Sequence, residues 1–243
     1  MIKELAIVIP CYNESNRIKH SEYNKCLFSN KSVSIIFVND GSTDETQKEL
    51  KRLEKKFPSQ VEVLKLDKNY GKAEAVRKGF LHSSKNNFKK IAFLDADLST
   101  DINECISLSK HIKEKITFVF GSRILKIDNN IKRKWHRFFF GRIIATFISK
   151  ILGVAVYDTQ CGCKIFSSEL SKKIFNTPFI SKWLFDVELF FRVISIYGRE
   201  NLKNHVREIP LSNWIDTSDS RVKMTYFFKL WIDLYRISKK YNR

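Results

Sequence analysis

Two aspartates separated by one residue follow a short apolar run near the middle of the chain. Asp95 and Asp97 come directly after residues 91–94, and where the extended geometry of a strand breaks, both carboxylates can approach one cation. Hard oxygen ligands of this type suit Mg²⁺ or Mn²⁺, which commonly bridge protein carboxylates to phosphate oxygens. We therefore expect a metal site at Asp95 and Asp97, although an acidic turn after a strand is also a common structural feature.

A further carboxylate, Asp40, closes another apolar run at residues 34–39. Gly41 permits a tight turn after it, and the polar residues 42–44 offer a helix N-cap. A carboxylate in this place can accept hydrogen bonds from a nucleobase or a ribose. The same residues also make a good turn without any ligand, so both interpretations stay open.

The segment Asn-Tyr-Gly-Lys at residues 69–72 precedes a helical pattern at residues 73–81. Backbone N–H groups at a helix start, together with the Lys72 ammonium, lie where an anionic phosphate could bind. The chain has neither the G-x-x-x-x-G-K-[ST] P-loop nor the G-x-G-x-x-G dinucleotide motif. Phosphate binding here would therefore use another kind of loop.

Strands and helices alternate in the first half of the chain. The apolar runs at residues 6–10, 34–39, 61–66 and 91–94 predict strands, and residues 43–56 and 72–83 predict helices. This alternation is typical of right-handed βαβ units and a mostly parallel sheet. Ligands of such sheets bind beyond the carboxyl ends of the strands, so we expect residues 10–14, 39–44 and 95–97 to share one crevice.

Length and composition indicate one globular α/β domain with an appendage. The chain has 243 residues, 43% of them hydrophobic and 29% charged, which excludes a disordered chain and a multi-span membrane protein. Its net charge of +18 is concentrated in the second half. Such a surface attracts nucleic acid or an anionic membrane, or is merely a solvated lysine-rich surface.

Five cysteines without a C-x-x-C pair predict a reduced intracellular protein rather than a disulfide scaffold or a zinc site. The first residues lead directly into a predicted strand without a signal-peptide pattern, so we expect no export.

Two later segments have amphipathic helical patterns. Residues 138–156 are apolar with a narrow polar stripe, and residues 226–237 repeat the theme with Lys229, Asp233, Arg236 and Lys240 opposite aromatic and aliphatic side chains. A transmembrane helix needs about 20 apolar residues. The first segment is therefore expected either to lie in the plane of a membrane interface or to pack against the sheet.

Five motifs in order resemble the family 2 glycosyltransferases of the GT-A fold: V-I-P-C-Y-N-E at 8–14, V-N-D-G-S-T-D at 38–44, N-Y-G-K-A-E-A at 69–75, L-D-A-D at 94–97 and G-S-R at 121–123. Two more, D-T-Q-C-G-C-K-I-F at 158–166 and W-L-F-D-V-E-L at 183–189, resemble the polyprenyl-phosphate and dolichyl-phosphate hexose synthases, especially the glucosyl branch. The resemblance covers residues 5 to about 216. It departs from the commonest pattern at Cys163 and at residues 212–220, and the second departure bears on the acceptor.

The resemblance implies a Rossmann-like GT-A fold, with a mostly parallel sheet flanked by helices and amphipathic helices toward the C-terminus. Residues 1–217 would form the catalytic domain, containing an interface helix at 138–156, and residues 218–243 a basic amphipathic helix.

The same resemblance implies inverting transfer from a nucleotide diphosphate sugar by direct displacement, with Mg²⁺ or Mn²⁺ as cofactor. The expected donor-binding residues are Pro10, Tyr12, Glu14, Asp40, Lys72, Asp95, Ala96 and Asp97. Asp158 and Asp97 would be catalytic. Acceptor or phosphate contacts would come from Arg123, Arg137, Gln160 and Asp186.

The role of Asp158 depends on the acceptor. A sugar hydroxyl needs a general base, whereas a lipid phosphate is already largely ionised because its second pKa is near ~6. We expect transfer from UDP-glucose, or less favourably GDP-mannose, to a polyprenyl phosphate, by a protein held peripherally at the cytoplasmic, inner face of a membrane.

Three alternatives remain at this point. Transfer to a glycan hydroxyl would keep the donor and change the acceptor. A basic nucleic-acid-binding module would fit the charge, but the chain carries no helix-turn-helix, zinc-finger or RNP-type signature, so we expect no nucleic-acid partner. A catalytically silent homologue would have lost the carboxylates that this chain retains.

Overall fold

The structure is a computed structural model that describes residues 3–132, 135–215 and 226–241. Within these ranges, the side chains of residues 136, 137, 140 and 226–228 lie outside the description.

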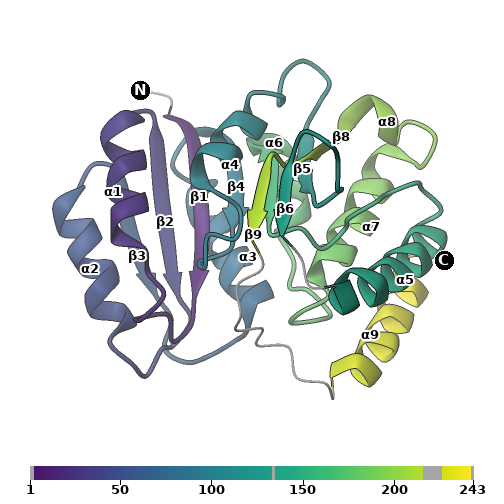
Figure 1. The fold of residues 1–243 in the computed structure, drawn as a ribbon, viewed down its shortest axis with the longest axis horizontal. Helices are drawn as coiled ribbons and strands as arrows, with labels where there is room; N and C mark the ends of the chain where they lie inside the picture. The colour runs from purple at the N-terminus through teal and green to yellow at the C-terminus, as the bar shows by residue number, and fades with distance from the viewer. Residues whose placement is uncertain (1–2, 133–134, 216–225, 242–243) are drawn as a thin grey trace.

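Seven strands form one twisted sheet in the order β3-β2-β1-β4-β7-β5-β8 (Figure 1). The strands are β1 (Lys3–Cys11), β2 (Val33–Asn39), β3 (Val61–Lys65), β4 (Phe88–Leu94), β5 (Phe118–Ser122), β7 (Cys163–Ser167) and β8 (Val206–Pro210). Neighbours are parallel except β7, which runs antiparallel to both β4 and β5. The predicted mostly parallel sheet is confirmed, and its four predicted strands are β1 to β4.

Helices cover both faces of the sheet. One face packs against α1 (His20–Ser29), α2 (Thr46–Lys56) and α4 (Ile102–Ser109), and the other against α3 (Lys72–Ser83), α6 (Ser168–Ile174) and α7 (Phe185–Tyr197). Because both faces are covered, every residue of β2 is buried, as the continuous apolar run of a central parallel strand requires. A short helix, α8 (Leu202–His205), leads into β8.

Helix α2 begins at Thr46 rather than at residue 43, where the sequence pattern placed it. The Asp44 carboxylate accepts hydrogen bonds from the backbone N–H and the hydroxyl of Thr46, at 3.0 and 2.5 Å. Its other oxygen accepts from the Ser15 hydroxyl at 2.7 Å. These contacts hold residues 43–45 in a loop, so the helix starts one turn later.

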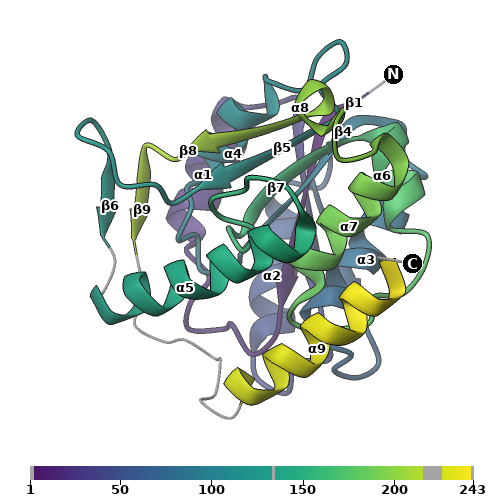
Figure 2. The same ribbon diagram turned by 90° about the vertical axis from the view of Figure 1, so that its right-hand side faces the viewer.

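A second layer beyond α7 consists of α5 (Trp135–Leu152) and α9 (Tyr226–Tyr241), which lie side by side in both views (Figures 1 and 2). The rings of Phe147 on α5 and Trp231 on α9 meet edge to face, with centroids 5.5 Å apart. Helix α5 starts at Trp135, three residues before the predicted helix at 138–156. It ends at Leu152, earlier than predicted, because Gly153 has a left-handed φ of 67°. The strands β6 (Asn130–Lys132) and β9 (Asn213–Ile215) form a separate two-stranded sheet, and β6 precedes α5 in the chain.

Helix α5 packs against the rest of the molecule with one side and exposes apolar side chains on another, and its contact with a membrane stays a prediction. Ile148 and Leu152 are buried in the core, whereas Phe139 and Phe147 are exposed. Arg142, in the polar stripe of this helix, donates to the backbone oxygen of Tyr157 at 2.7 Å, and its guanidinium lies over the Tyr157 ring.

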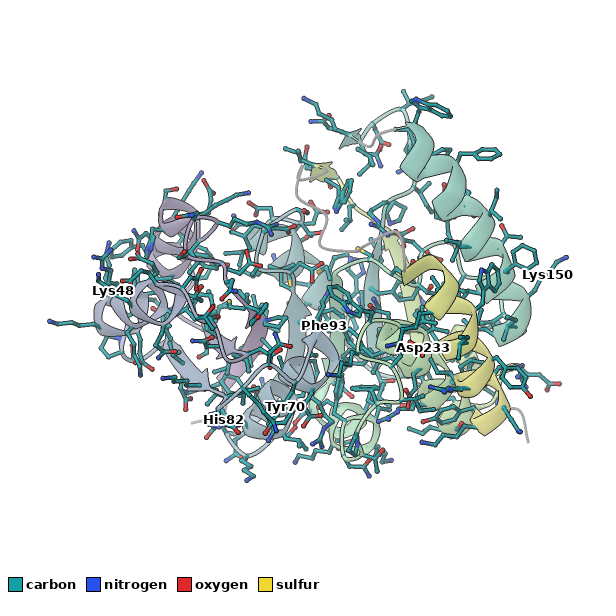
Figure 3. The ribbon with its side chains drawn as sticks, turned by 90° about the horizontal axis from the view of Figure 1, so that it is seen from below. Lys48, Tyr70, His82, Phe93, Lys150 and Asp233 are labelled. Carbon is teal, nitrogen blue, oxygen red and sulfur yellow. The ribbon has the colours of Figure 1, made fainter. Side chains whose placement is uncertain are left out.

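Helix α9 is attached to α7 and the loop before it through polar contacts. Asp233 is buried and accepts a hydrogen bond from the Ser181 hydroxyl at 2.7 Å. The Tyr241 hydroxyl donates to Glu188 at 2.9 Å. Asp233 of the predicted polar stripe therefore faces the rest of the molecule. Lys150 of α5, in contrast, points outward (Figure 3).

No helix in the described part of the chain has both the length and the apolar character needed to cross a bilayer.

The contact between α3 and the sheet depends on Gly79. A Cβ at this position would lie 2.3 Å from Cγ1 of Val8, a buried side chain of β1. We predict that Gly79→Ala lowers the free energy of unfolding by about 1–2 kcal/mol, because overpacking of ~1–3 kcal/mol exceeds the gain of up to ~1 kcal/mol in helix propensity. Urea denaturation of the wild type and the variant measures this difference in the free energy of unfolding.

Lys78→Ala is the matched control, since Lys78 is exposed on the same helix and should change stability by less than about 0.5 kcal/mol. A Gly79→Ala variant as stable as the wild type would contradict this packing.

Candidate active site

The loops that follow β1 and β2 are joined by hydrogen bonds. The Asn13 N–H donates to the Ser42 hydroxyl at 3.0 Å, and the Thr43 N–H donates to Oδ1 of Asn13 at 2.9 Å. The Glu14 N–H donates to the Thr46 hydroxyl at 2.7 Å. Since β1, β2, β4 and β5 are parallel, their following loops meet at one edge of the sheet, which we call the carboxyl edge.

Asp40 organises the loop that leads into α3. Its carboxylate is buried and accepts hydrogen bonds from the backbone N–H groups of Tyr70 and Gly71, both at 2.8 Å. Gly41, with a φ of 66°, lets this loop approach, because a Cβ there would lie 2.3 Å from the carbonyl carbon of Lys68. Asp40 thus fixes the start of α3, a role that the sequence did not reveal, and its contact with a nucleobase stays a prediction.

Asp95 lies between the start of α3 and the turn before β7. Its N–H donates to the carbonyl oxygen of Gly162 at 3.2 Å, and a Cβ on Gly162 would lie 2.1 Å from the Asp95 carboxylate. The Lys72 ammonium is 2.5 Å from Oδ1 of Asp95. Burial lowers the pKa of Lys72, but Asp95, Asp186 and Asp97 outweigh burial and leave that pKa raised, so the ammonium stays charged.

Asp97 is held from two sides. Its Oδ1 accepts a hydrogen bond from the Ser99 N–H at 2.9 Å, and its Oδ2 accepts one from Nη2 of Arg17 at 3.2 Å. Nε of Arg17 lies 3.4 Å from Oε2 of Glu14. Arg17 was not among the predicted site residues, although it follows Glu14 by three residues in a loop expected beside Asp97.

The backbone between these two aspartates is anchored to α1. The buried Tyr23 hydroxyl donates to the carbonyl oxygen of Ala96 at 3.5 Å. Burial raises the pKa of the Tyr23 phenol well above its ordinary value, so the hydroxyl remains a donor.

Asp95 and Asp97 fit a divalent cation that shares its coordination with a ligand. Within the described residues there is no group of three His, Cys, Asp or Glu placed to hold a metal ion. A cation here would have at most two protein carboxylates, which is how Mg²⁺ commonly binds together with substrate phosphates. Gly162 leaves the room that the Asp95 carboxylate needs for this.

Asp158 and Arg123 form a bidentate ion pair at the end of β5. Nε and Nη2 of Arg123 donate to the two Asp158 carboxylate oxygens at 2.6 and 2.8 Å, and the Arg123 N–H adds a third hydrogen bond at 3.1 Å. Burial alone raises the pKa of Asp158, but the charge and hydrogen bonds of Arg123 outweigh it and lower that pKa to about 2. The Arg123 guanidinium also lies over the Trp214 ring, 5.2 Å from its centroid.

Glu208 of β8 positions the backbone of Asp158. Its two carboxylate oxygens accept hydrogen bonds from the N–H groups of Tyr157 and Asp158, at 2.9 and 2.8 Å. The Gln160 N–H donates to Oδ1 of Asp158 at 3.2 Å, and the residue itself is exposed. Gln160 therefore lies beside Asp158 as expected, whereas Glu208 was not foreseen.

Asp186, expected near the acceptor, is paired inside the protein. The ammonium of Lys164, whose side chain is completely buried, donates to Oδ1 of Asp186 and to the carbonyl oxygen of Cys161, both at 2.6 Å. The Lys164 and Lys72 ammonium groups lie over the ring of Phe93, 5.2 and 5.9 Å from its centroid, and Phe93 is labelled in Figure 3. The lysine within the apolar run C-K-I-F is the sequence feature from which a buried ion pair could have been predicted.

Three predicted site residues remain: Pro10 and Tyr12, which lie at the carboxyl edge, and Arg137. Pro10 is paired with Val38 inside the sheet, and Tyr12 follows β1 with 37% of its surface exposed. The side chain of Arg137 lies outside the described residues, as do residues 216–220 of the segment that departs from the family pattern.

The mostly parallel sheet with an Asp-Ala-Asp segment at its carboxyl edge has the GT-A fold, which is found in glycosyltransferases. A family model described as Glycosyl transferase family 2 matches residues 6–175. The chain belongs to this family, and it is a glycosyltransferase enzyme.

Similar sequences include a dolichyl-phosphate beta-glucosyltransferase of Trichomonas vaginalis, which is 35% identical over 95% of this chain and 69% of its own length. The Dictyostelium discoideum dolichyl-phosphate beta-glucosyltransferase is 30% identical over 98% of this chain and 74% of its own.

Among solved structures, glucosyl-3-phosphoglycerate synthase from Mycobacterium tuberculosis in complex with UDP is similar, with a TM-score of 0.68 and 17% identity over 98% of this chain and 80% of that one. The same synthase with Mn²⁺, UDP-glucose and phosphoglyceric acid gives a TM-score of 0.67 and 16% identity over 97% and 77%. At this identity the likeness establishes the fold.

The ion pair of Asp158 predicts a specific pH dependence of stability. Its folded pKa of about 2 lies below the ordinary value of 3.8, so the stabilisation is fully present above about pH 4 and is lost as the pH falls toward 2. We predict that the stability difference between wild type and Asp158→Asn shrinks by ~2 kcal/mol across that window.

Urea denaturation at a series of pH values measures this difference. Glu200→Gln is the control, because Glu200 is exposed and its variant should track the wild type closely. An Asp158→Asn difference that stays constant down to the lowest pH would contradict the pairing.

Proposed function

We propose that the chain transfers glucose, with inversion, from UDP-glucose to dolichyl phosphate or another polyprenyl phosphate. Support for the acceptor comes from relatives named dolichyl-phosphate beta-glucosyltransferase, which align with nearly the whole chain. Support for the donor comes from the similar fold of a synthase crystallised with UDP-glucose and Mn²⁺. GDP-mannose is the second donor to be tested.

The observation that carries the proposal is the pairing of Asp158 with Arg123, which keeps Asp158 ionised. A general base works best with a pKa near the operating pH, and Asp158, with a pKa of about 2 and both oxygens bound by Arg123, is a poor proton acceptor. A sugar hydroxyl would need such a base. A phosphate monoester is already largely a dianion at neutral pH, since its second pKa is near ~6, and needs none.

Asp158 then acts as a positioning residue for Arg123. The bidentate pair fixes the plane of the guanidinium, and Glu208 fixes the backbone of Asp158 in turn. Asp158 uses one N–H of Nε and one of Nη2, so the N–H groups of Nη1 and the second one of Nη2 can face two phosphate oxygens. Arg123 is therefore proposed to hold the acceptor phosphate, with Gln160 beside it and Arg137 as a further basic residue.

The donor diphosphate is proposed to bind at Asp95, Ala96 and Asp97, near Lys72. A divalent cation bound by the two aspartates, Mg²⁺ or Mn²⁺, would neutralise part of the charge that develops on the departing diphosphate. The nucleoside is proposed to lie along Pro10, Tyr12, Glu14 and Asp40, which line the ends of β1 and β2.

In the reaction, an oxygen of the acceptor phosphate attacks the anomeric carbon of glucose. The bond from that carbon to the donor phosphate oxygen breaks, and the nucleoside diphosphate leaves with the electron pair. Attack opposite to the leaving group inverts the configuration. Arg123 orients the nucleophile, and the positive charge of Lys72 stabilises the leaving group.

The test is transfer of radiolabelled sugar from UDP-glucose or GDP-mannose to dolichyl phosphate, undecaprenyl phosphate or unphosphorylated dolichol, in detergent with Mn²⁺. We expect glucosylated lipid from the two phosphates and none from dolichol. Gly162→Ala should reduce the rate at least about tenfold, a barrier increase of ~1.4 kcal/mol, because the new methyl group displaces the Asp95 carboxylate.

Asp128→Asn, in an exposed loop, is the control and should retain wild-type activity. Labelling of a glycan hydroxyl without a lipid product would overturn the proposed acceptor, and mannosyl transfer alone would overturn the proposed donor.

We further propose that α5 and α9 together dock on the cytoplasmic, inner face of a membrane as a peripheral surface. Their exposed apolar side chains are Trp135, Phe138, Phe139, Ile143, Phe147, Trp231, Ile232 and Tyr235. Exposed basic residues accompany them at Lys150, Lys229, Arg236 and Lys239, as expected for an interfacial helix on anionic lipid. In this proposal residues 1–217 are the catalytic domain, and residues 218–243 are an appended basic segment that contains α9.

Vesicle sedimentation tests this surface. We predict that Phe139→Ser combined with Ile232→Ser lowers binding to vesicles rich in anionic lipid at least about tenfold, because each side chain contributes ~1.5–3 kcal/mol when buried in lipid. Phe28→Ser is the matched control, since Phe28 is equally exposed on α1, and it should bind normally. Equal loss in both variants, or in neither, would contradict the assignment.

A further inference from the structure

Both aspartates of the Asp-Ala-Asp segment are already paired with cations of the protein. Lys72 Nζ lies 2.5 Å from Oδ1 of Asp95, and Arg17 Nη2 lies 3.2 Å from Oδ2 of Asp97. All four side chains are partly buried, with exposed fractions between 21% and 36%. In such surroundings ion pairs are stronger than on an open surface, where they contribute only ~0–1 kcal/mol.

The two cations come from different parts of the chain. Arg17 belongs to the loop after β1, where it also contacts Glu14, and Lys72 is the first residue of α3, fixed by the contacts of Asp40 with Tyr70 and Gly71. The backbone at each position is held by contacts outside the acidic segment. The carboxylates therefore face two cations that the fold places independently.

A divalent cation that arrives alone meets an unfavourable balance of charge. To reach Asp95 and Asp97 it must compete with an ammonium and a guanidinium for the same oxygens, and the displaced cations remain nearby. Placing a double positive charge beside two single ones is costly in a partly desolvated site. A diphosphate brings the negative charge that removes this cost, because the displaced groups can then bind its oxygens.

We propose that Arg17 and Lys72 are internal counterions that keep the metal site closed to a lone cation and move to the diphosphate when metal and nucleotide bind together. The inference rests on the proposed function for the location of the metal and the diphosphate. It assigns Arg17 a role in coupling the two ligands. By linkage, the nucleotide raises metal affinity by the same factor as the metal raises nucleotide affinity.

Replacing either counterion should raise the affinity for the metal alone, whereas loss of a metal ligand would lower it. Arg17→Gln and Lys72→Gln each remove one cation that competes with the metal for a carboxylate, so affinity for Mn²⁺ alone should rise. In the presence of UDP the same variants should gain nothing or lose affinity, because one phosphate contact is missing. The ratio of Mn²⁺ affinities with and without UDP should therefore fall.

The measurement is titration of the full chain with Mn²⁺, following the electron paramagnetic resonance signal of free Mn²⁺ with and without saturating UDP. For the wild type we expect UDP to raise Mn²⁺ affinity at least about fivefold, the lower end of typical coupling between sites. Arg17→Gln should raise the affinity for Mn²⁺ alone and reduce that ratio. Arg52→Gln is the matched control, because Arg52 pairs with Glu49 on exposed α2.

The outcomes separate this inference from the proposed function. If Asp97→Asn leaves Mn²⁺ binding unchanged, the location of the metal is wrong and the proposed donor site fails with it. If Mn²⁺ binding depends on Asp97 but Arg17→Gln and Lys72→Gln leave Mn²⁺ affinity without UDP unchanged or lower, the inference is overturned while the proposed function stands.

Discussion

Charge pairing at the carboxyl edge is the interaction on which the other features of the site depend. Four aspartates each meet one lysine or arginine from another part of the chain: Asp95 meets Lys72, Asp97 meets Arg17, Asp158 meets Arg123 and Asp186 meets Lys164. Without these partners, carboxylates so close together would repel one another and resist burial. Removing one partner from a buried pair typically costs ~3–5 kcal/mol, because the remaining charge is left uncompensated.

The antiparallel strand β7 and the turn before it make two of these pairs possible, those of Asp158 and of Asp186. By inserting between β4 and β5 it places Lys164 opposite Phe93 and brings Gly162 beneath Asp95. The turn before β7 also brings Asp158 to the end of β5, where Asp158 pairs with Arg123. A purely parallel sheet would have separated the acidic segment after β4 from Asp158, so this one reversed strand joins the donor and acceptor parts of the proposed site.

The sequence predicted those features that depend on local pattern. Apolar runs such as residues 34–39 identified the strands, and the polar segments at strand ends identified the carboxyl edge, because parallel strands end together. The pairs of Arg17 with Asp97 and of Lys164 with Asp186 could not be predicted, since each joins residues far apart in sequence through the fold. The burial of Asp233 was missed for the same reason, because the helical pattern of α9 does not reveal the Ser181 hydroxyl that faces it.

The central claim is that the acceptor is an ionised phosphate and that no protein carboxylate removes a proton from it. The most direct test is the pH dependence of single-turnover glucosyl transfer to dolichyl phosphate and to its difluoromethylphosphonate analogue, whose second ionisation occurs at lower pH. The account predicts an acidic limb near pH 6 for the phosphate, set by its second pKa of ~6, and a shift of that limb to lower pH with the analogue. A limb that stays at the same pH with both acceptors would show that a group of the protein titrates instead, and would contradict the account.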